Sequence, residues 1–215
     1  MSSLSQVQLL EAFKVALENA AHPEIAPLME TWGYDEAART ADLELLAQTH
    51  AARTDQQREV SEADVAHKAK AQTKKAARPG FVLLHRFIRT ADRKNPELDI
   101  ASTLAVKPLP TAEAPFIGYT TDLLDRIASH PDIVAALAEL GYAQARLDQL
   151  RPLIDAISDA KVSQTKEQGE AEMATAAYNA FLDQVRTAYS FIKMIAQEAL
   201  KDKPQLVEIM GLGKA

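Results

Sequence analysis

The sequence predicts an all-α protein made of two tandem, structurally similar up-and-down helical bundles of the four-helix type, related by an internal repeat. Three observations predict this fold class. The chain of 215 residues is rich in Ala and has only seven Gly, which favours helices because Ala loses no side-chain entropy in a helix. Apolar residues recur at steps of three and four, which marks one face of a helix. A motif near the N-terminus also returns later in the chain.

The internal repeat becomes visible when the sequence is shifted by 108 positions. His22-Pro23 then aligns with His130-Pro131, and Gly33-Tyr34 aligns with Gly141-Tyr142. Matches at Gly and Pro are informative, because both residues restrict the backbone at helix boundaries. Further identities at this spacing pair Ile25 with Ile133, Leu45 with Leu153, Gln56 with Gln164, Glu59 with Glu167, Glu62 with Glu170, Arg78 with Arg186, Pro96 with Pro204, Leu98 with Leu206 and Leu104 with Leu212.

The repeat predicts the domain organisation. A first helical unit with an N-terminal helix covers residues 1–104, and a second unit covers residues 119–215. The segment 105–118 between them contains Pro108, Pro110 and Pro115. This composition is typical of a semi-rigid, extended linker.

Each unit is expected to begin with two short helices. Residues 1–21 form an amphipathic helix, and residues 119–129 do the same before the second unit. Pro23 or Pro131 then opens a short helix at its first position, which Gly33 or Gly141 closes as a left-handed cap.

A long helical stretch follows in each unit. A polar segment interrupts its apolar stripe at residues 54–62 and again at 162–170. We interpret this segment as the tip of a helical hairpin, with Ser61 as the N-cap of the returning helix. The alternative is one continuous helix of nearly 60 residues, about 85 Å long, because the three-four phase passes through the segment without a break.

Prolines and aromatic residues refine this prediction. Pro79 and Pro152 are expected to break or kink their helices. Pro96 and Pro204 are each expected to open a last short helix. The rings of Tyr34, Tyr142 and the single Trp32 are expected to close the bundle ends.

A helix ending in Gly-Tyr, a long polar-tipped stretch and a terminal Pro-x-Leu together resemble uncharacterised bacterial tandem helical-bundle proteins. The resemblance extends over nearly the whole chain. It implies the helical fold, and it implies no activity for any residue.

Composition excludes several chemistries. The chain has no Cys, so disulfides, thiolate nucleophiles and cysteine-bound metal clusters are ruled out. No apolar run approaches a membrane span, and residues 1–21 lack the pattern of a secretory leader. We therefore expect a cytoplasmic protein with no membrane association.

No metal, cofactor or catalytic site is predicted. A di-iron bundle needs two Glu-x-x-His motifs, whereas this chain offers only Asp64-x-x-His67. A mononuclear site using His67, Glu59 or Glu62 is a remaining alternative. The recurring polar residues of the segments 54–62 and 162–170 are expected to cap helix ends or to pair with Arg78 and Arg186.

A basic run is the most unusual feature of the sequence. Residues 68–94 contain nine Lys or Arg residues and a single acidic residue, Asp92, whereas residues 176–202 contain three of each sign. The run is either a solvated face that complements acidic surface elsewhere in the protein, or a docking surface for an acidic partner. The residues of the candidate docking surface are Lys74, Lys75, Arg78, Arg86 and Arg89.

These observations favour a non-enzymatic interaction or scaffold protein that binds a protein partner or a second copy of itself. One alternative is a bundle that binds a metal or a small molecule. Another is nucleic-acid binding through residues 68–94, which is disfavoured by the formal net charge of −6 and by the lack of interleaved aromatic residues.

Overall fold

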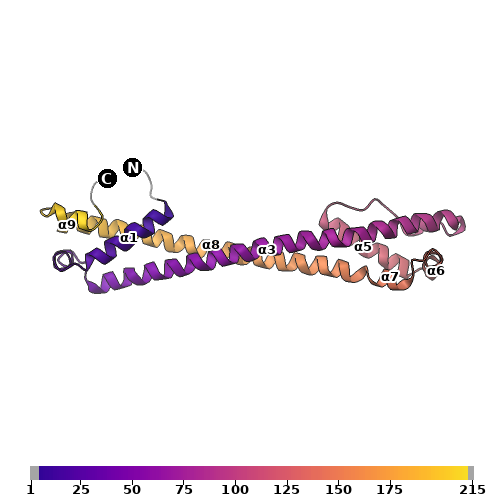
Figure 1. The fold of residues 1–215 in the computed structure, drawn as a ribbon, viewed down its shortest axis with the longest axis horizontal. Coiled ribbons are helices and arrows are strands. Elements are labelled where there is room, and N and C mark those ends of the chain that lie inside the picture. Colours follow the sequence, from indigo (N-terminus) through magenta and orange to yellow (C-terminus); the bar gives the residue numbers. More distant parts are fainter. Residues whose placement is uncertain (1–4, 213–215) are drawn as a thin grey trace. The chain divides into compact units, whose positions relative to one another are not determined.

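Residues 5–212 of the computed structural model are described here, and they form helices and no β-strand, which confirms the all-α prediction (Figure 1). The four N-terminal residues of the predicted first helix, including Leu4, lie outside the described range. The helices are α1 (Gln6–Ala20), α2 (Ala26–Glu30), α3 (Glu36–Lys94), the 3₁₀ helix η1 (Pro96–Leu98), α4 (Ile100–Thr103), α5 (Glu113–Ala128), α6 (Pro131–Glu139), α7 (Gln144–Asp148), α8 (Arg151–Ala199) and α9 (Pro204–Ile209).

The two long helices are continuous, so the predicted hairpin is wrong and its alternative is right. Helix α3 has 59 residues and α8 has 49, and both pass through the polar segments without a turn (Figure 1). Neither segment contains Pro, and the single Gly169 lowers helix propensity without ending the helix. Ser61 consequently lies inside α3 and caps no helix.

The chain divides into two compact units, each of which combines residues from both halves of the sequence. Unit 1 contains residues up to Val60 together with residues from Glu170 onward, and unit 2 contains Ser61–Gly169. The sequence analysis placed the boundary between the units at residues 105–118, whereas the compact units divide within the two long helices, after Val60 and after Gly169. Each long helix contributes one part of its length to each unit.

The core of unit 1 is formed by α1, the turn around α2, the first part of α3, the last part of α8 and α9. Phe13 of α1 is fully buried, and its ring meets that of Tyr189 edge-on with centroids 6.4 Å apart. Leu46 of α3 joins the same cluster as Leu182 of α8. Non-polar side chains from five segments therefore share one core, whose burial is the main source of stability.

The core of unit 2 joins the second part of α3 to α5, α6, α7 and the first part of α8. Phe81 of α3 and Phe116 of α5 are fully buried in an edge-to-face pair with ring centroids 5.6 Å apart. The buried residues of α3 in this unit recur at steps of four and three. They are Ala77, Phe81, Leu84, Ile88 and Ala91, and we call them the buried seam of α3.

The predicted left-handed caps are confirmed. Gly33 has φ 84° and Gly141 has φ 83°, which glycine adopts without a steric penalty. Tyr34 donates its amide hydrogen to the Met29 carbonyl, and Tyr142 does the same to Leu137, the pattern of a Schellman motif. Both tyrosines are buried, as expected.

Three local predictions are wrong. Trp32 has 51% of its surface exposed, because the buried positions of its turn are taken by Met29 and Tyr34. Pro79 lies inside α3 and does not break it, so the predicted break is wrong, while the predicted kink stays a prediction. Pro152 is the second residue of α8, where its missing amide hydrogen costs no helical hydrogen bond, so it helps to start this helix.

The proline predictions at other helix starts have mixed outcomes. Pro131 and Pro204 are the first residues of α6 and α9, and Pro96 begins η1, as expected. Pro23 does not open a helix, because α2 begins later, at Ala26. The predicted extended linker is also shorter than expected, since α5 already begins at Glu113 and includes Pro115 and Gly118.

Within residues 5–212, no helix combines the length and the apolar character needed to cross a lipid bilayer.

Candidate docking surface

All five candidate docking residues lie on α3 within unit 2, but two of them are used inside the unit. The Arg78 guanidinium donates to the carbonyl of Pro110 at 2.9 Å and lies 6.0 Å from the centre of the Phe116 ring. The Lys74 ammonium donates to the carbonyl of Thr111. These contacts fasten the irregular segment that precedes α5, so Lys74 and Arg78 have a structural role.

Other cations of the basic run are paired with acidic residues. Lys70 lies 3.4 Å from a carboxylate oxygen of Glu113, and Lys94 lies 3.2 Å from one of Glu139. The expectation that part of the run complements acidic surface elsewhere in the protein is therefore confirmed for these residues. The predicted pairing of Arg78 with an acidic residue is wrong, because Arg78 binds a backbone carbonyl.

The remaining cations lie on one exposed face of α3. Lys75, Arg86, Arg89 and Arg93 are exposed, and none of them forms an ion pair within the described part of the chain. Together with two apolar residues between them they follow steps of four and three. We call this set, Lys75, Pro79, Val82, Arg86, Arg89 and Arg93, the basic stripe.

The basic stripe lies opposite the buried seam. Each stripe residue from Lys75 to Arg89 precedes a seam residue by two positions, which is about 200° of rotation around a helix. Helix α3 thus turns an apolar face to the core of unit 2 and a cationic face to solvent. Asp92 is not part of this face, and it accepts a hydrogen bond from the amide of Ala101. Asp64 lies on the same side of α3 as Lys75, but three turns before it, outside the stripe.

The middle of the basic stripe is apolar. Val82 has 36% of its surface exposed and the neighbouring Leu83 has 40%. With Pro79 they line a shallow depression of about 590 Å³, which Lys75, Arg78 and Arg86 border. The arrangement of an apolar centre with a charged border is typical of protein-interaction surfaces.

A buried histidine lies close to the stripe. His85 is 7% exposed, and its Nε2 atom lies 3.1 Å from the Tyr119 hydroxyl, which also donates to the Lys107 carbonyl. Burial, followed by the positive charge of Arg89, lowers the pKa of His85. Burial likewise raises the pKa of Tyr119. The two rings tie the segment before α5 to α3.

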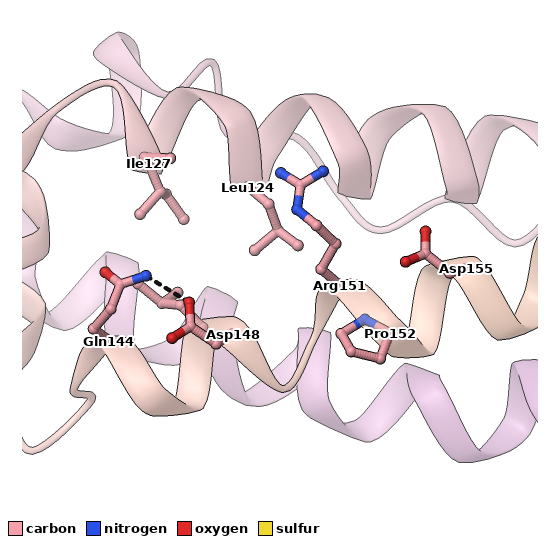
Figure 2. A pocket seen from close by; sticks show the side chains of 9 residues that line it. Leu124, Ile127, Gln144, Asp148, Arg151, Pro152 and Asp155 are labelled. Atoms are coloured by element: carbon pink, nitrogen blue, oxygen red, sulfur yellow. Dashed lines mark hydrogen bonds between the residues drawn. The ribbon is translucent and has the colours of Figure 1, made fainter.

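A second feature of unit 2 is a pocket of about 370 Å³ between α5, α7 and α8 (Figure 2). Leu124, Ile127 and Leu147 give it apolar walls. Three of its polar side chains are engaged, because Gln144 donates to Asp148 at 2.7 Å and Arg151 pairs with Asp125. This pocket is the place where a small-molecule ligand would be sought, and no buried polar group in it points to one.

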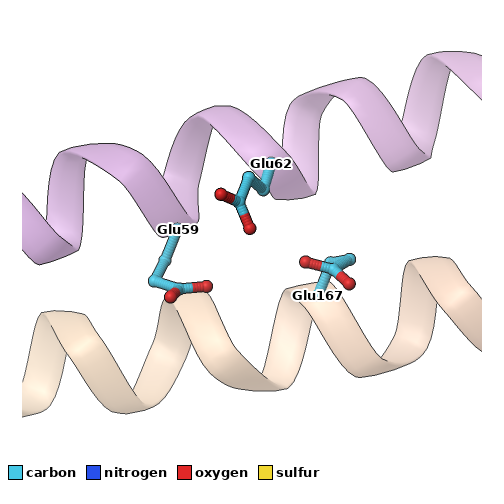
Figure 3. Close-up of side chains that lie close together, drawn as sticks. All are labelled: Glu59, Glu62 and Glu167. Atoms are coloured by element: carbon cyan, nitrogen blue, oxygen red, sulfur yellow. The ribbon is translucent and has the colours of Figure 1, made fainter.

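The recurring glutamates lie inside the long helices, away from any helix end. Figure 3 shows the side chains of three of them, Glu59, Glu62 and Glu167. In unit 2, a carboxylate oxygen of Glu62 lies within 4.8 Å of one of Glu167. In unit 1, Glu59 is buried, with one oxygen paired to Arg58 and the other without a hydrogen-bond partner. The prediction that these residues cap helix ends is wrong.

The residues of the metal alternative differ in their surroundings. His67 and Asp64 are exposed on α3, and His67 does not belong to any group of described residues with metal-ligand spacing. The carboxylate pair of unit 2 offers far fewer oxygen atoms than the six to eight ligands of a calcium site.

Comparisons with protein-family models, with curated proteins and with solved structures found no match to this chain.

The sequence analysis named only some of the residues that share the exposed face of α3. It identified Lys75, Arg86 and Arg89, and it missed Arg93 and the apolar centre at Val82 and Leu83. The spacing of the residues could have indicated Arg93 and Val82, because steps of four and three from Lys75 reach every residue of the stripe. Lys74 and Arg78 were included because sequence alone does not show which cations a neighbouring segment occupies.

Proposed function

We propose that this protein is a non-enzymatic interaction module that binds an acidic segment of a protein partner through the basic stripe of α3. One observation carries the proposal. The stripe presents exposed cations with no ion pair in the described chain around an apolar centre, while the cations beside it are engaged within unit 2. Charge of one sign attracts an oppositely charged partner, and apolar contact in the centre adds affinity.

A protein partner is favoured over nucleic acid at this stripe. Phosphate contacts require cations alone, so they would leave the side chains of Val82 and Leu83 without a matching surface. No aromatic residue lies in the stripe on which a base could stack. The cytoplasmic location predicted from the sequence remains a prediction.

The proposal is tested with a fluorescently labelled polyglutamate peptide and anisotropy measurements at low salt. Reversing three stripe charges together, as K75E, R86E and R89E, is expected to weaken binding at least about tenfold, because each change replaces an attraction with a repulsion. The matched control reverses three exposed lysines of unit 1, as K193E, K201E and K203E, and changes the net charge equally. Equal weakening in both variants would contradict a defined docking surface.

We also propose that the two units derive from an internal duplication with the spacing of 108 residues. Two features support this proposal. The Gly-Tyr motif forms the same cap after α2 and after α6. Positions 108 residues apart on α3 and α8, such as Leu84 and Ile192, are both fully buried.

A further inference from the structure

The basic stripe is straight and regular enough to restrict the kind of segment that it binds. Lys75 and Arg93 are 18 residues apart, which is five helical turns, so they point in the same direction from the axis of α3. The residues between them stay on the same side because steps of four and three alternate around this direction. An occupant that follows the stripe must present groups at the same interval over five turns.

The charges and the apolar residues of the stripe occupy different parts of its length. Lys75 stands at one end, Pro79 and Val82 form the centre together with the neighbouring Leu83, and Arg86, Arg89 and Arg93 form the other end. A matching occupant therefore has an apolar group of two or three side chains with carboxylates before and after it. These carboxylates belong on the side that faces α3.

We propose, as an extension of the proposed function and resting on it, that the partner segment is an acidic amphipathic α-helix that packs along the basic stripe. A helix repeats its side chains at steps of three and four with the same rise as α3, so its carboxylates and apolar residues meet those of the stripe in register. An extended peptide advances more than 3 Å per residue, about twice the rise of a helix, and loses this register within a few residues.

The charge distribution around the stripe favours an acidic helix. Within unit 2, Lys70 and Lys94 already have carboxylate partners at Glu113 and Glu139, whereas the stripe cations have none among the described residues. The matching face of a second copy does not suit the stripe, because its exposed positions include Asp183 and Met194 of α8 and Lys201 after it, and they form no acidic series.

The experiment compares two synthetic peptides of identical composition. In the first, Leu residues form one short apolar group and Glu residues flank it at steps of three and four, in an Ala-rich helical background. In the second, the same residues are scrambled so that no face is acidic. The patterned peptide is expected to bind the full chain at least about tenfold more tightly than the scrambled peptide.

A second variant separates the apolar centre from the charges. The exposed pair Val82 and Leu83 is replaced in V82S/L83S, and circular dichroism checks that the helices are retained. This variant is expected to lose most of the preference for the patterned peptide while it still binds polyglutamate. Retention of the full preference would contradict the role of the apolar centre.

The possible outcomes separate the two proposals. Equal binding of both peptides, with weakening by K75E/R86E/R89E, would overturn the helical partner and leave the docking surface in place. Tighter binding of a double-stranded DNA oligonucleotide than of either peptide would overturn both. Light scattering of the protein alone provides the last check, because self-association that the triple variant abolishes would make a second copy the occupant and overturn the proposed partner.

Discussion

Two stretches of the chain, residues 75–93 of α3 and residues 183–201, which cover the end of α8 and the turn after it, have similar inner faces and different outer faces. The buried seam of α3 corresponds, 108 positions later, to Val185, Tyr189, Ile192, Ala196 and Ala199, all of which are buried or half-buried. The basic stripe corresponds to Asp183, Thr187, Ser190, Met194, Gln197 and Lys201, which are exposed and of mixed character.

This difference separates what builds the units from what distinguishes them. Both stretches need an apolar face to bury against their own unit, and both have one. Only α3 carries a basic stripe on its outer face, while on α8 the carboxylate of Asp183 is paired with Arg186. The outer face of α3 is therefore not required by the helical fold, which is why we assign it the proposed function.

The largest effects are expected from substitutions on the two inner faces, which should lower the stability by similar amounts. Leu84→Ala and Ile192→Ala each remove a fully buried side chain and leave a cavity, so each is expected to lower the free energy of unfolding by about 2–5 kcal/mol. Urea denaturation measures both. Leu83→Ala, at a half-exposed position next to Leu84, serves as the control and should change stability by less than about 1 kcal/mol. A large loss at only one of the two buried positions would contradict the claim that the two inner faces are equivalent.

The next effect concerns the two Gly-Tyr caps. Gly33→Ala and Gly141→Ala place a side chain at a positive φ, where each is expected to cost about 1–2 kcal/mol through backbone strain. No atom outside the adjoining backbone lies within 4 Å of the added Cβ at either position, so crowding does not contribute. Thermal unfolding measures both variants. Clearly unequal losses would count against a duplicated cap.

Moving the stripe to α8 sharpens the comparison of the outer faces. In a chain that carries K75E/R86E/R89E, the changes D183K, M194R and Q197R place cations at the matching positions of α8. Binding of the polyglutamate peptide should recover to within about threefold of the original chain, because surface charge governs this contact. Failure to recover would mean that a basic outer face alone does not make the docking surface.

A smaller effect is expected from pH. Because the folded-state pKa of His85 lies below its unfolded value of about 6.5, the unfolded chain takes up a proton more readily. The contribution of His85 to the free energy of unfolding is therefore fully present above about pH 6.5, and it is lost as the pH falls through the folded-state pKa of His85. Melting temperatures at about pH 7.5 and about pH 5.5 should differ less in His85→Gln than in the original chain. An equal difference in both would show that His85 does not contribute.

Much of the fold was predictable from the sequence because helices are encoded locally. The steps of three and four, the scarcity of Gly and the Gly-Tyr caps all act within a few residues of one another. The course of the long helices was harder to predict. The polar segments 54–62 and 162–170 have the composition of a turn, yet they lack the Pro or paired Gly that would force the chain out of a helix.

The make-up of the two units was beyond local reasoning. Neighbouring helices usually pack together, so each half of the sequence was expected to fold on itself. Instead, Leu46 shares a core with Leu182, and Phe81 shares one with Ile154. These partners are distant in sequence, and many alternative pairings of apolar stripes satisfy the same periodicity.

The candidate surface was predictable as a segment and not as a set of side chains. The basic run is evident in the sequence, whereas the separation of Lys74 and Arg78 from Lys75 and Arg86 depends on the carbonyl groups of Pro110 and Thr111. These backbone acceptors come from a segment some thirty residues later, and no pattern in residues 68–94 points to it.

Photo-crosslinking tests the central claim most directly. The patterned acidic peptide, with a benzophenone side chain at the centre of its apolar group, is bound to the full chain, irradiated and analysed by mass spectrometry. The docking surface proposed for α3 predicts crosslinks within residues 75–93 that K75E/R86E/R89E removes. Crosslinks concentrated in residues 183–201, at the end of α8 and just after it, would contradict it. Crosslinks unchanged by the three charge reversals would contradict it as well.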